Sequence, residues 1–316
     1  MTLLEYAEVR RQIQAEPATL LLGNGFSIPA CGRFQYGSLY EEAKQSLDRD
    51  IALFKSLDTN DFERALRALD DAGHVAAHIG VELDCTDVRD RVKDALIETV
   101  QKVHPAYGEI ELGWWAKAAD LTQGFDRIFT TNYDLLLYWL MLQRGQDHFT
   151  DGFQRVDSDL VFTEHFPEGR TQVLFLHGAL HLRQTPNGAV KAVASGNRSL
   201  PNVLDELMTS GIRPLFVSEG ESRHKRSAIE RNPYLAFASK QLRRGRGDLV
   251  TFGLSFSESD DHLLDAIAAA PSYKRIFVGI HAPASNTIMR VSGKLENWKN
   301  EVPDRKVEFY STQGLL

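Results

Sequence analysis

The sequence predicts an α/β protein: a doubly wound, mostly parallel, six-stranded Rossmann-like sheet with a helical insertion. Six short runs of β-branched, aromatic and other apolar residues alternate with segments in which apolar residues recur every three or four positions. Several runs are apolar at nearly every position, which is typical of parallel strands covered on both faces. The predicted strands are residues 18–22, 127–130, 172–176, 249–252, 275–280 and 306–310.

Two connections between these strands are too long for a single helical crossover. Between the first and second strands, apolar spacing predicts helices over residues 39–57, 62–79 and 88–103. We therefore expect residues 1–38 and 124–316 to form the sheet domain and residues 39–123 to form a helical insertion or cap. A second insertion, residues 182–248, is expected to end in a helix over residues 225–242.

Composition is that of an ordinary globular protein, with 43% hydrophobic and 25% charged residues among 316. The formal net charge of −7 argues against general nucleic-acid binding. No apolar run approaches the roughly 20 residues needed to span a membrane, and the N-terminus lacks a signal-peptide pattern. Only Cys31 and Cys85 are present, too few for a four-thiolate zinc site. We therefore expect a cytoplasmic protein without a membrane partner.

A glycine-containing turn follows the first predicted strand. Glycines at such a strand end let the backbone approach a phosphate closely, with free N–H groups directed at the anion. A lone Gly-x-Gly is weak support, because an ordinary tight turn explains it equally well. The candidate cofactor-binding residues in this turn are Gly23, Asn24, Gly25, Phe26 and Ser27.

Polar residues also follow the second predicted strand, at Thr131, Asn132 and Asp134. One of the last two residues can cap the helix that follows. Two such side chains beside a glycine turn are more than capping requires. We expect Asn132 and Asp134 to be catalytic and to hydrogen-bond a ribose or a water, and Thr131 to contribute to binding.

His177 and Gly178 follow the third predicted strand, and Gly253 and Ser255 follow the fourth. An isolated His at the end of a buried strand is more often a core residue, but Gly178 leaves room here for a ligand. Histidine is the usual general base near neutral pH. Gly253 and Ser255 can bind a second phosphate or ribose. Since the carboxyl ends of parallel strands meet at one edge, all four segments are expected to form one site.

Three further features leave alternatives open. His181 could join His177 at a metal, but a third ligand is missing, so no metal is expected. His281, after the fifth predicted strand, is a candidate contact for an adenine. Residues 223–246 hold eight Lys or Arg and one acidic residue. We favour a solvated helix face for this segment over a phosphate-attracting lid or a docking surface for an acidic partner.

Taken in order, the four strand-end segments resemble the motifs of the sirtuin superfamily. Sirtuins carry a Gly-Ala-Gly-x-Ser loop, a Thr-Gln-Asn-x-Asp segment, a His-Gly pair and a Gly-Thr-Ser segment. The similar segments here are residues 23–27, 130–134, 177–178 and 253–255. Residues 179–252 contain no cysteine for the zinc module of protein-deacylating sirtuins. The sequence looks more like the sirtuin-like domains of bacterial antiphage systems.

This resemblance implies an NAD+ hydrolase that releases nicotinamide and ADP-ribose and depletes cellular NAD during antiphage defence. NAD+ is then the substrate, His177 the general base, and Asn132 and Asp134 the residues that hold the ribose or the water. One alternative is a non-hydrolytic regulatory module that binds NAD or ADP-ribose. A less favoured one is an NAD-dependent protein deacylase or ADP-ribosyltransferase.

The resemblance also bears on partners. We expect no appended sensor domain, so a toxic activity would be controlled through assembly. We expect a homo-oligomer formed through the helical insertion, or a separate regulator such as a HerA-type ATPase or an Argonaute-like protein.

Overall fold

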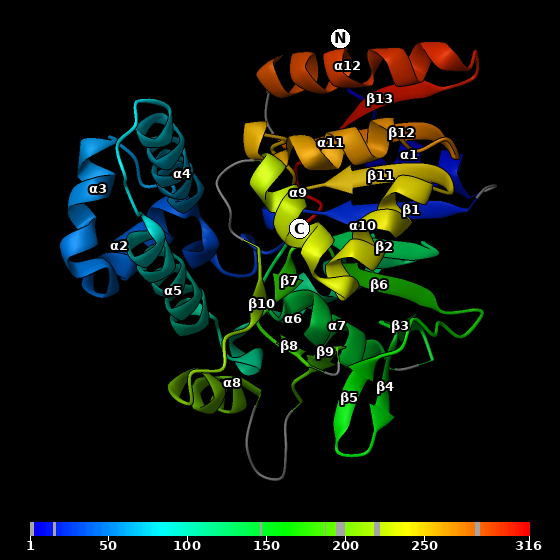
Figure 1. The fold of residues 1–316 in the computed structure, drawn as a ribbon. Helices are drawn as coiled ribbons and strands as arrows, with labels where there is room; N and C mark the ends of the chain where they lie inside the picture. The colour runs from blue at the N-terminus through cyan, green and yellow to red at the C-terminus, as the bar shows by residue number, and fades with distance from the viewer. Residues whose placement is uncertain are drawn as a thin grey trace.

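A computed structural model confirms the doubly wound α/β fold, built on a seven-stranded parallel sheet (Figure 1). The structure describes residues 3–14, 17–145, 147–186, 188–193, 200–217, 222–281 and 285–316. The strand order is β13-β12-β11-β1-β2-β6-β3, and every neighbouring pair is parallel. The strands are β1 (Ala18–Leu22), β2 (Arg127–Thr130), β3 (Phe149–Thr150), β6 (Thr171–Phe175), β11 (Gly247–Phe252), β12 (Tyr273–Ile280) and β13 (Lys306–Ser311).

The order of the strands reverses between β1 and β11. From β1 the sheet continues through β2 to β6, whereas from β11 it continues in the opposite direction through β12 to β13. Ligands of such sheets bind outside the carboxyl ends of the strands at this switch point. The six predicted strands are all present, and the two-residue strand β3 adds a seventh at one edge.

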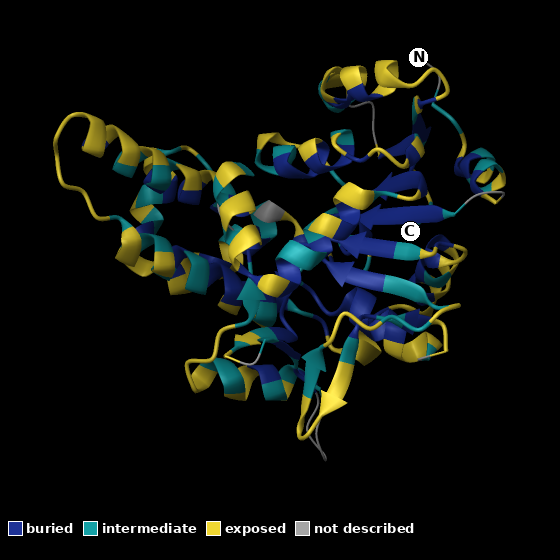
Figure 2. Cartoon of the chain, turned by 45° about the vertical axis from the view of Figure 1, so that its right-hand side comes forward, coloured by how far each residue is buried: buried dark blue, intermediate teal, exposed yellow. Residues whose placement is uncertain are grey.

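Helices cover both faces of the sheet, which explains the near-continuous apolar runs. All five residues of β1 and all six of β11 are buried. Figure 2 shows these central strands enclosed by the surrounding helices. One face is covered by α10 (Pro233–Arg244), α11 (Asp261–Ala268) and α12 (Ser285–Glu301), and the other by α1 (Tyr6–Ile13), α6 (Leu112–Thr122) and α7 (Leu136–Arg144) (Figure 1). Among the described helices, none is long and apolar enough to cross a membrane.

The helical insertion forms a group of helices beside the carboxyl edge of the sheet (Figure 1). Its helices are α2 (Tyr36–Leu47), α3 (Ile51–Ser56), α4 (Phe62–His78) and α5 (Thr86–Val103). Helix α4 buries an apolar stripe that includes Phe62 and Leu66, and its opposite side is exposed. The predicted helix over residues 39–57 is interrupted at Asp48, whose φ of 40° ends α2. The exact division of the chain into two domains stays a prediction.

The second insertion differs from the sequence-based expectation. It contributes to a four-stranded antiparallel sheet of order β4-β5-β9-β8, and β7 pairs with β10. These strands are short and several lie half exposed, so they lack the apolar runs that mark the central sheet. Their bounds are β4 (Phe153–Val156), β5 (Asp159–Phe162), β7 (Gly178–Ala179), β8 (Leu182–Thr185), β9 (Gly188–Lys191) and β10 (Leu215–Phe216).

The single helix predicted over residues 225–242 is wrong. After α8 (Leu200–Thr209), the chain forms two helices, α9 (Ser222–Arg231) and α10. Pro233 starts α10, because proline has no N–H to donate to the preceding turn and is favoured at a first helical position. The Asn232 side chain caps this start by accepting a hydrogen bond from the Leu235 N–H at 3.1 Å.

Three glycines pack against each other where β1 and β11 end. A Cβ on Gly25 would lie 2.5 Å from the Gly253 Cα, and one on Gly23 would lie 2.6 Å from the Gly253 oxygen. Gly253 itself has a φ of +73°. Only glycine fits such an approach between two backbones, and only glycine adopts this φ without strain. The glycines after the two strands therefore hold the switch point together.

Replacing Gly253 with alanine should destabilise the protein by about 2 to 4 kcal/mol, because it combines left-handed backbone strain with overlap against Gly25. The matched control is Gly293→Ala, in the exposed middle of α12, where a Cβ meets nothing within 4 Å. That change should stabilise by about 0.5 to 1 kcal/mol. Urea unfolding of both variants measures the difference. An unchanged unfolding midpoint for Gly253→Ala would show that the loops can separate freely.

Candidate functional site

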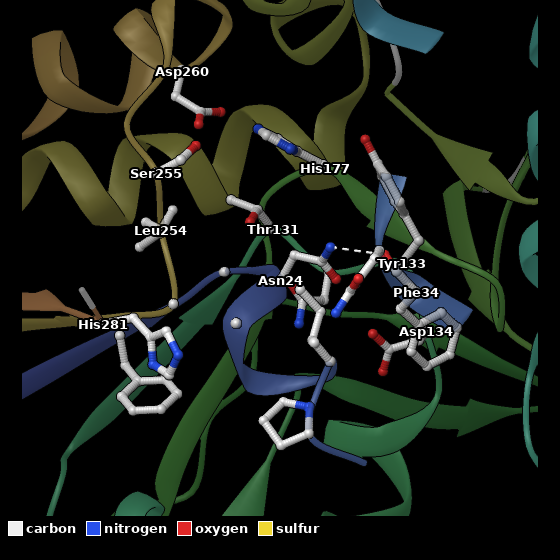
Figure 3. A pocket seen from close by; sticks show the side chains of 18 of the residues that line it. Asn24, Phe34, Thr131, Tyr133, Asp134, His177, Leu254, Ser255, Asp260 and His281 are labelled. Atoms are coloured by element: carbon white, nitrogen blue, oxygen red, sulfur yellow. Dashed lines mark hydrogen bonds between the residues drawn. The ribbon is translucent and has the colours of Figure 1, made fainter. Parts of the chain in front are cut away.

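A cavity of about 540 Å³ lies at the switch point, between the carboxyl edge of the sheet and the helical insertion (Figure 3). Its volume falls within the range of roughly 300 to 1,000 Å³ typical of small-molecule sites. The insertion covers it with apolar side chains, namely Leu39, Phe62, Leu96 and Val100. The sheet edge supplies the polar side chains. No Lys or Arg side chain is among the described residues that line the cavity.

The glycine turn after β1 uses its N–H groups for structure. The Gly23 N–H donates to the Phe252 oxygen and the Gly25 N–H donates to the Gly253 oxygen, both at 2.9 Å. These two amides are therefore satisfied by the neighbouring loop and are not the free anion donors that the sequence suggested. The turn continues as a 3₁₀-helix, Asn24–Phe26, which brings the Asn24 side chain to the cavity.

A chain of hydrogen bonds orients the Asn132 side chain. The Asn132 Nδ2 donates to the Ser27 Oγ at 2.8 Å, and the Ser27 hydroxyl donates to the Asp134 Oδ2 at 2.6 Å. In the part of the chain that the structure describes, no hydrogen bond reaches the Asn132 Oδ1. The amide oxygen is therefore the atom of Asn132 that can accept from a ribose hydroxyl or a water.

Asp134 is buried and has a structural role at the start of α7. Its Oδ1 accepts from the Leu136 N–H at 2.9 Å, so Asp134 provides the capping that the sequence left open between two residues. Burial raises the pKa of its carboxyl group, and the neighbouring His104 and the Ser27 hydroxyl oppose that rise. His104 accepts from the Leu135 N–H through Nε2. This nitrogen is therefore unprotonated, in agreement with the burial that lowers the pKa of His104.

His177 is buried at the end of β6 and forms a pair with a second histidine. Its Nε2 lies 2.8 Å from the Nε2 of His262, in the first turn of α11. Burial lowers the pKa of His177 well below its ordinary value, and His262 and Lys225 lower it further. The His177 ring is therefore neutral at neutral pH, which is the form a general base requires.

A buried ion pair joins the insertion to the rest of the protein beside these histidines. Lys225, on α9, is completely buried and its Nζ lies 2.8 Å from the Oε1 of Glu63 on α4. Asp260 lines the same cavity, and its pKa is raised to about 6, mainly by burial, with Glu63 adding to the rise and Lys225 opposing it. The side chains of Lys225, Glu63 and Asp260 thus share one environment from which water is partly excluded.

The structure brings most of the predicted site residues to the cavity. Those that line it are Gly23, Asn24, Gly25, Thr131, Asn132, Asp134, His177, Gly253 and Ser255. Figure 3 shows several of these side chains around the opening. The structure also places His281 on the cavity wall. The functional roles of these residues stay predictions.

Three predicted residues lie behind the cavity wall. Phe26 packs edge-on against Trp114 in the core, and Ser27 is the buried link between Asn132 and Asp134. Gly178 has a φ of +82°, and a Cβ there would lie 2.0 Å from the Leu215 oxygen, so this glycine allows β7 to approach β10.

Sequence reasoning missed Glu63, Lys225, Asp260 and His262. Asp260 and His262 could have been suspected, because they follow the predicted Gly253 loop closely. Polar residues at a helix start are usually caps, however, so their position alone did not indicate a site. Lys225 was assigned to a solvated basic face, and that assignment is wrong because its side chain is fully buried. His181 does not face His177; it stacks on Tyr138 with ring centroids 4.3 Å apart. Among the described residues, no group of three or more His, Cys, Asp or Glu is arranged to hold a metal.

Replacing Asp260 with asparagine should stabilise the protein at pH 7.5 by about 1 to 2 kcal/mol. The folded-state pKa is raised to about 6 from 3.8, so the folded protein binds a proton more tightly than the unfolded chain. Protonation of Asp260 therefore adds to the free energy of unfolding of the wild type below pH 4, and this contribution is lost as pH rises through 6. Urea unfolding between pH 4 and 8 should show this loss in the wild type and not in Asp260→Asn.

The matched control for this measurement is Asp147→Asn, because the Asp147 side chain is 97% exposed. It should leave the pH dependence unchanged. An Asp260→Asn variant that is less stable than the wild type at pH 7.5 would mean that the ionised carboxylate is favoured by its surroundings.

Comparison with known proteins adds a family assignment. No curated protein matches the sequence. A solved structure described as "Structural Basis for the Mechanism and Regulation of Sir2 Enzymes" is similar over 94% of this chain and 98% of that chain, at 11% identity and a TM-score of 0.37. A likeness at that level does not support a conclusion about chemistry. A family described as "Domain of unknown function (DUF4917)" matches residues 20–314, and because this is nearly the whole chain, the protein belongs to the DUF4917 family.

Proposed function

We propose that the protein hydrolyses NAD+ to nicotinamide and ADP-ribose. The observation that carries this proposal is the convergence of Asn132 and His177 with two glycine loops around one cavity at the switch point. Switch points of doubly wound sheets are where dinucleotides bind. The order of the four motifs, which resembles that of sirtuins, supports NAD+ as the dinucleotide.

The reaction needs a base and an environment that favours positive charge. The bond between nicotinamide and ribose breaks, and its electron pair leaves with the neutral nicotinamide, so no acid is required. A cationic ribose remains, and water adds to it. The proton of that water passes to His177 and then to solvent, and the products are nicotinamide, ADP-ribose and one proton.

The charge of the cavity agrees with such a transition state. Its ionisable side chains include Glu63, Asp134 and Asp260, and no Lys or Arg is among the described lining residues. Ionised carboxylates near the ribose stabilise a cation that develops there. Asn132, whose amide is oriented by Ser27, is placed to hold the ribose or the water through its Oδ1.

A non-hydrolytic NAD- or ADP-ribose-binding module is the second candidate. It is favoured by the low pKa of His177, because a base whose pKa lies far below the working pH accepts protons poorly. The two candidates differ in one measurement. A binding module raises its melting temperature with NAD+ and releases no nicotinamide.

We further propose that this activity serves antiphage defence by depleting cellular NAD, under the control of assembly or a separate regulator. The helical insertion is the proposed assembly surface. It exposes Val75, Ile79, Val81 and Leu83, which lie at the end of α4 and in the following loop. Light scattering over a range of protein concentrations tests self-assembly. A monomer that is fully active alone would contradict this form of control.

His177→Ala and Asn132→Ala should each lower the rate of nicotinamide release at least about a hundredfold. One positioned general base contributes about 10²- to 10⁴-fold, and misplacing a reactant can cost about 10²-fold. Purified protein is incubated with NAD+, and the products are separated by chromatography. Circular dichroism establishes that each variant is folded. His165→Leu, in an exposed loop away from the cavity and the insertion, is the control and should keep the wild-type rate. Loss of NAD+ at the wild-type rate in either alanine variant would remove that residue from the mechanism.

A further inference from the structure

The His177–His262 pair can be assigned one proton arrangement from its contacts. The two rings are 5.0 Å apart between centroids and their Nε2 atoms are 2.8 Å apart. Two nitrogens at that distance form a hydrogen bond only when one carries the proton and the other has a free electron pair. The remaining contacts of His262 decide which nitrogen is the donor.

The Nδ1 of His262 lies 3.1 Å from the carbonyl oxygen of Ser259. A carbonyl oxygen only accepts, so the proton of His262 is on Nδ1. Burial, followed by the nearby positive charge of Lys225, lowers the pKa of His262 to about 3. The ring is therefore neutral and its Nε2 has a free electron pair, which accepts from the Nε2–H of His177.

We propose that His262 is a positioning residue that holds His177 as the Nε2–H tautomer and leaves Nδ1 of His177 as the nitrogen that accepts a proton. The tautomer assignment stands on the contacts of the two rings and on the burial that keeps His262 neutral, whereas its catalytic consequence rests on the proposed NAD+ hydrolysis. A histidine is effective as a base only when the correct nitrogen is free, and a partner on the other nitrogen sets which one that is.

Burial, together with the surrounding positive charges, keeps both rings neutral. Lys225 faces the pair from α9, and the more distant charge of Arg226 lowers the pKa of His262 by a smaller amount. Glu63 neutralises part of the Lys225 charge through their ion pair, and Asp260 lies on the same cavity. A doubly protonated pair next to a buried ammonium group is strongly disfavoured. The neutral arrangement therefore persists throughout the neutral pH range.

Proton transfer strengthens the contact between the two histidines. When Nδ1 of His177 accepts a proton, the ring becomes an imidazolium and its Nε2–H donates to His262 as a charge-assisted hydrogen bond. His262 thus holds the ring in place before the transfer and stabilises its charge afterwards. His262 remains neutral in both states and exchanges no proton.

The tautomer is tested without substrate by nitrogen-15 NMR of the histidine rings, at pH 7.5. The chain has ten histidines, and the His177 signals are identified by their loss in His177→Ala. In the wild type we expect a protonated Nε2 and an unprotonated Nδ1 on His177. In His262→Leu, which removes the acceptor, we expect averaged shifts from both tautomers. In His262→Gln, whose amide oxygen can accept, we expect the wild-type pattern. A protonated Nδ1 in the wild type, or an unchanged pattern in His262→Leu, would overturn the inference.

The catalytic consequence is tested by the kinetics of the same variants with NAD+. His262→Leu should lower kcat by about 10- to 100-fold, as loss of an orienting partner typically does, with KM changed less than about threefold. His262→Gln should recover most of the lost rate, and His165→Leu is again the control. If His177→Ala is inactive while His262→Leu has the wild-type kcat, the positioning role is refuted and the proposed function stands. If the wild type releases no nicotinamide, the proposed function fails, and the NMR result still decides the tautomer.

Discussion

The contact between the two glycine loops at the switch point is the constraint on which the rest of the site depends. Gly23 and Gly25 lie directly against Gly253, closer than any side chain would allow. Their N–H groups also donate across this contact. Strands β1 and β11 therefore end at the same level, and the residues that follow β2 and β6 meet around one cavity. A wider separation of the loops would change the distance between every group that lines it.

Charged groups buried beside this cavity connect the helical insertion to the sheet. A buried ammonium group without a partner is strongly destabilising, so Lys225 on α9 requires Glu63 on α4 to remain close. Burial lowers the pKa of His177 and His262, and the same positive charge lowers both further. This ion pair therefore contributes both to the position of the insertion and to the lowered pKa of the histidine pair. Any movement of α4 away from α9 changes the electrostatic environment of His177.

Much of the fold could be predicted because its central strands are buried on both faces. Apolar runs, several of them nearly continuous, identified six of the seven strands, and β1 and β2 have the predicted bounds. The antiparallel sheet was missed because its strands are short: β4 is largely exposed and β8 is mostly half-buried, so burial leaves no clear apolar pattern in them. The break between α9 and α10 could have been predicted from Asn232 and Pro233, because Asn followed by Pro is favoured at a helix start.

By itself, the sequence determined the type of sheet and the polar residues that follow its strands, because both depend on local chemistry: strand burial, turn glycines and strand-end side chains. Only the tertiary structure decided the partners of those residues. Ser27 forms a buried link between Asp134 and Asn132, and His262, 85 positions away in sequence from His177, sets the tautomer of that ring. Lys225 can be buried as a charged group because Glu63 on α4 provides a carboxylate partner. Such pairings depend on distances between elements, which no local pattern in the sequence records.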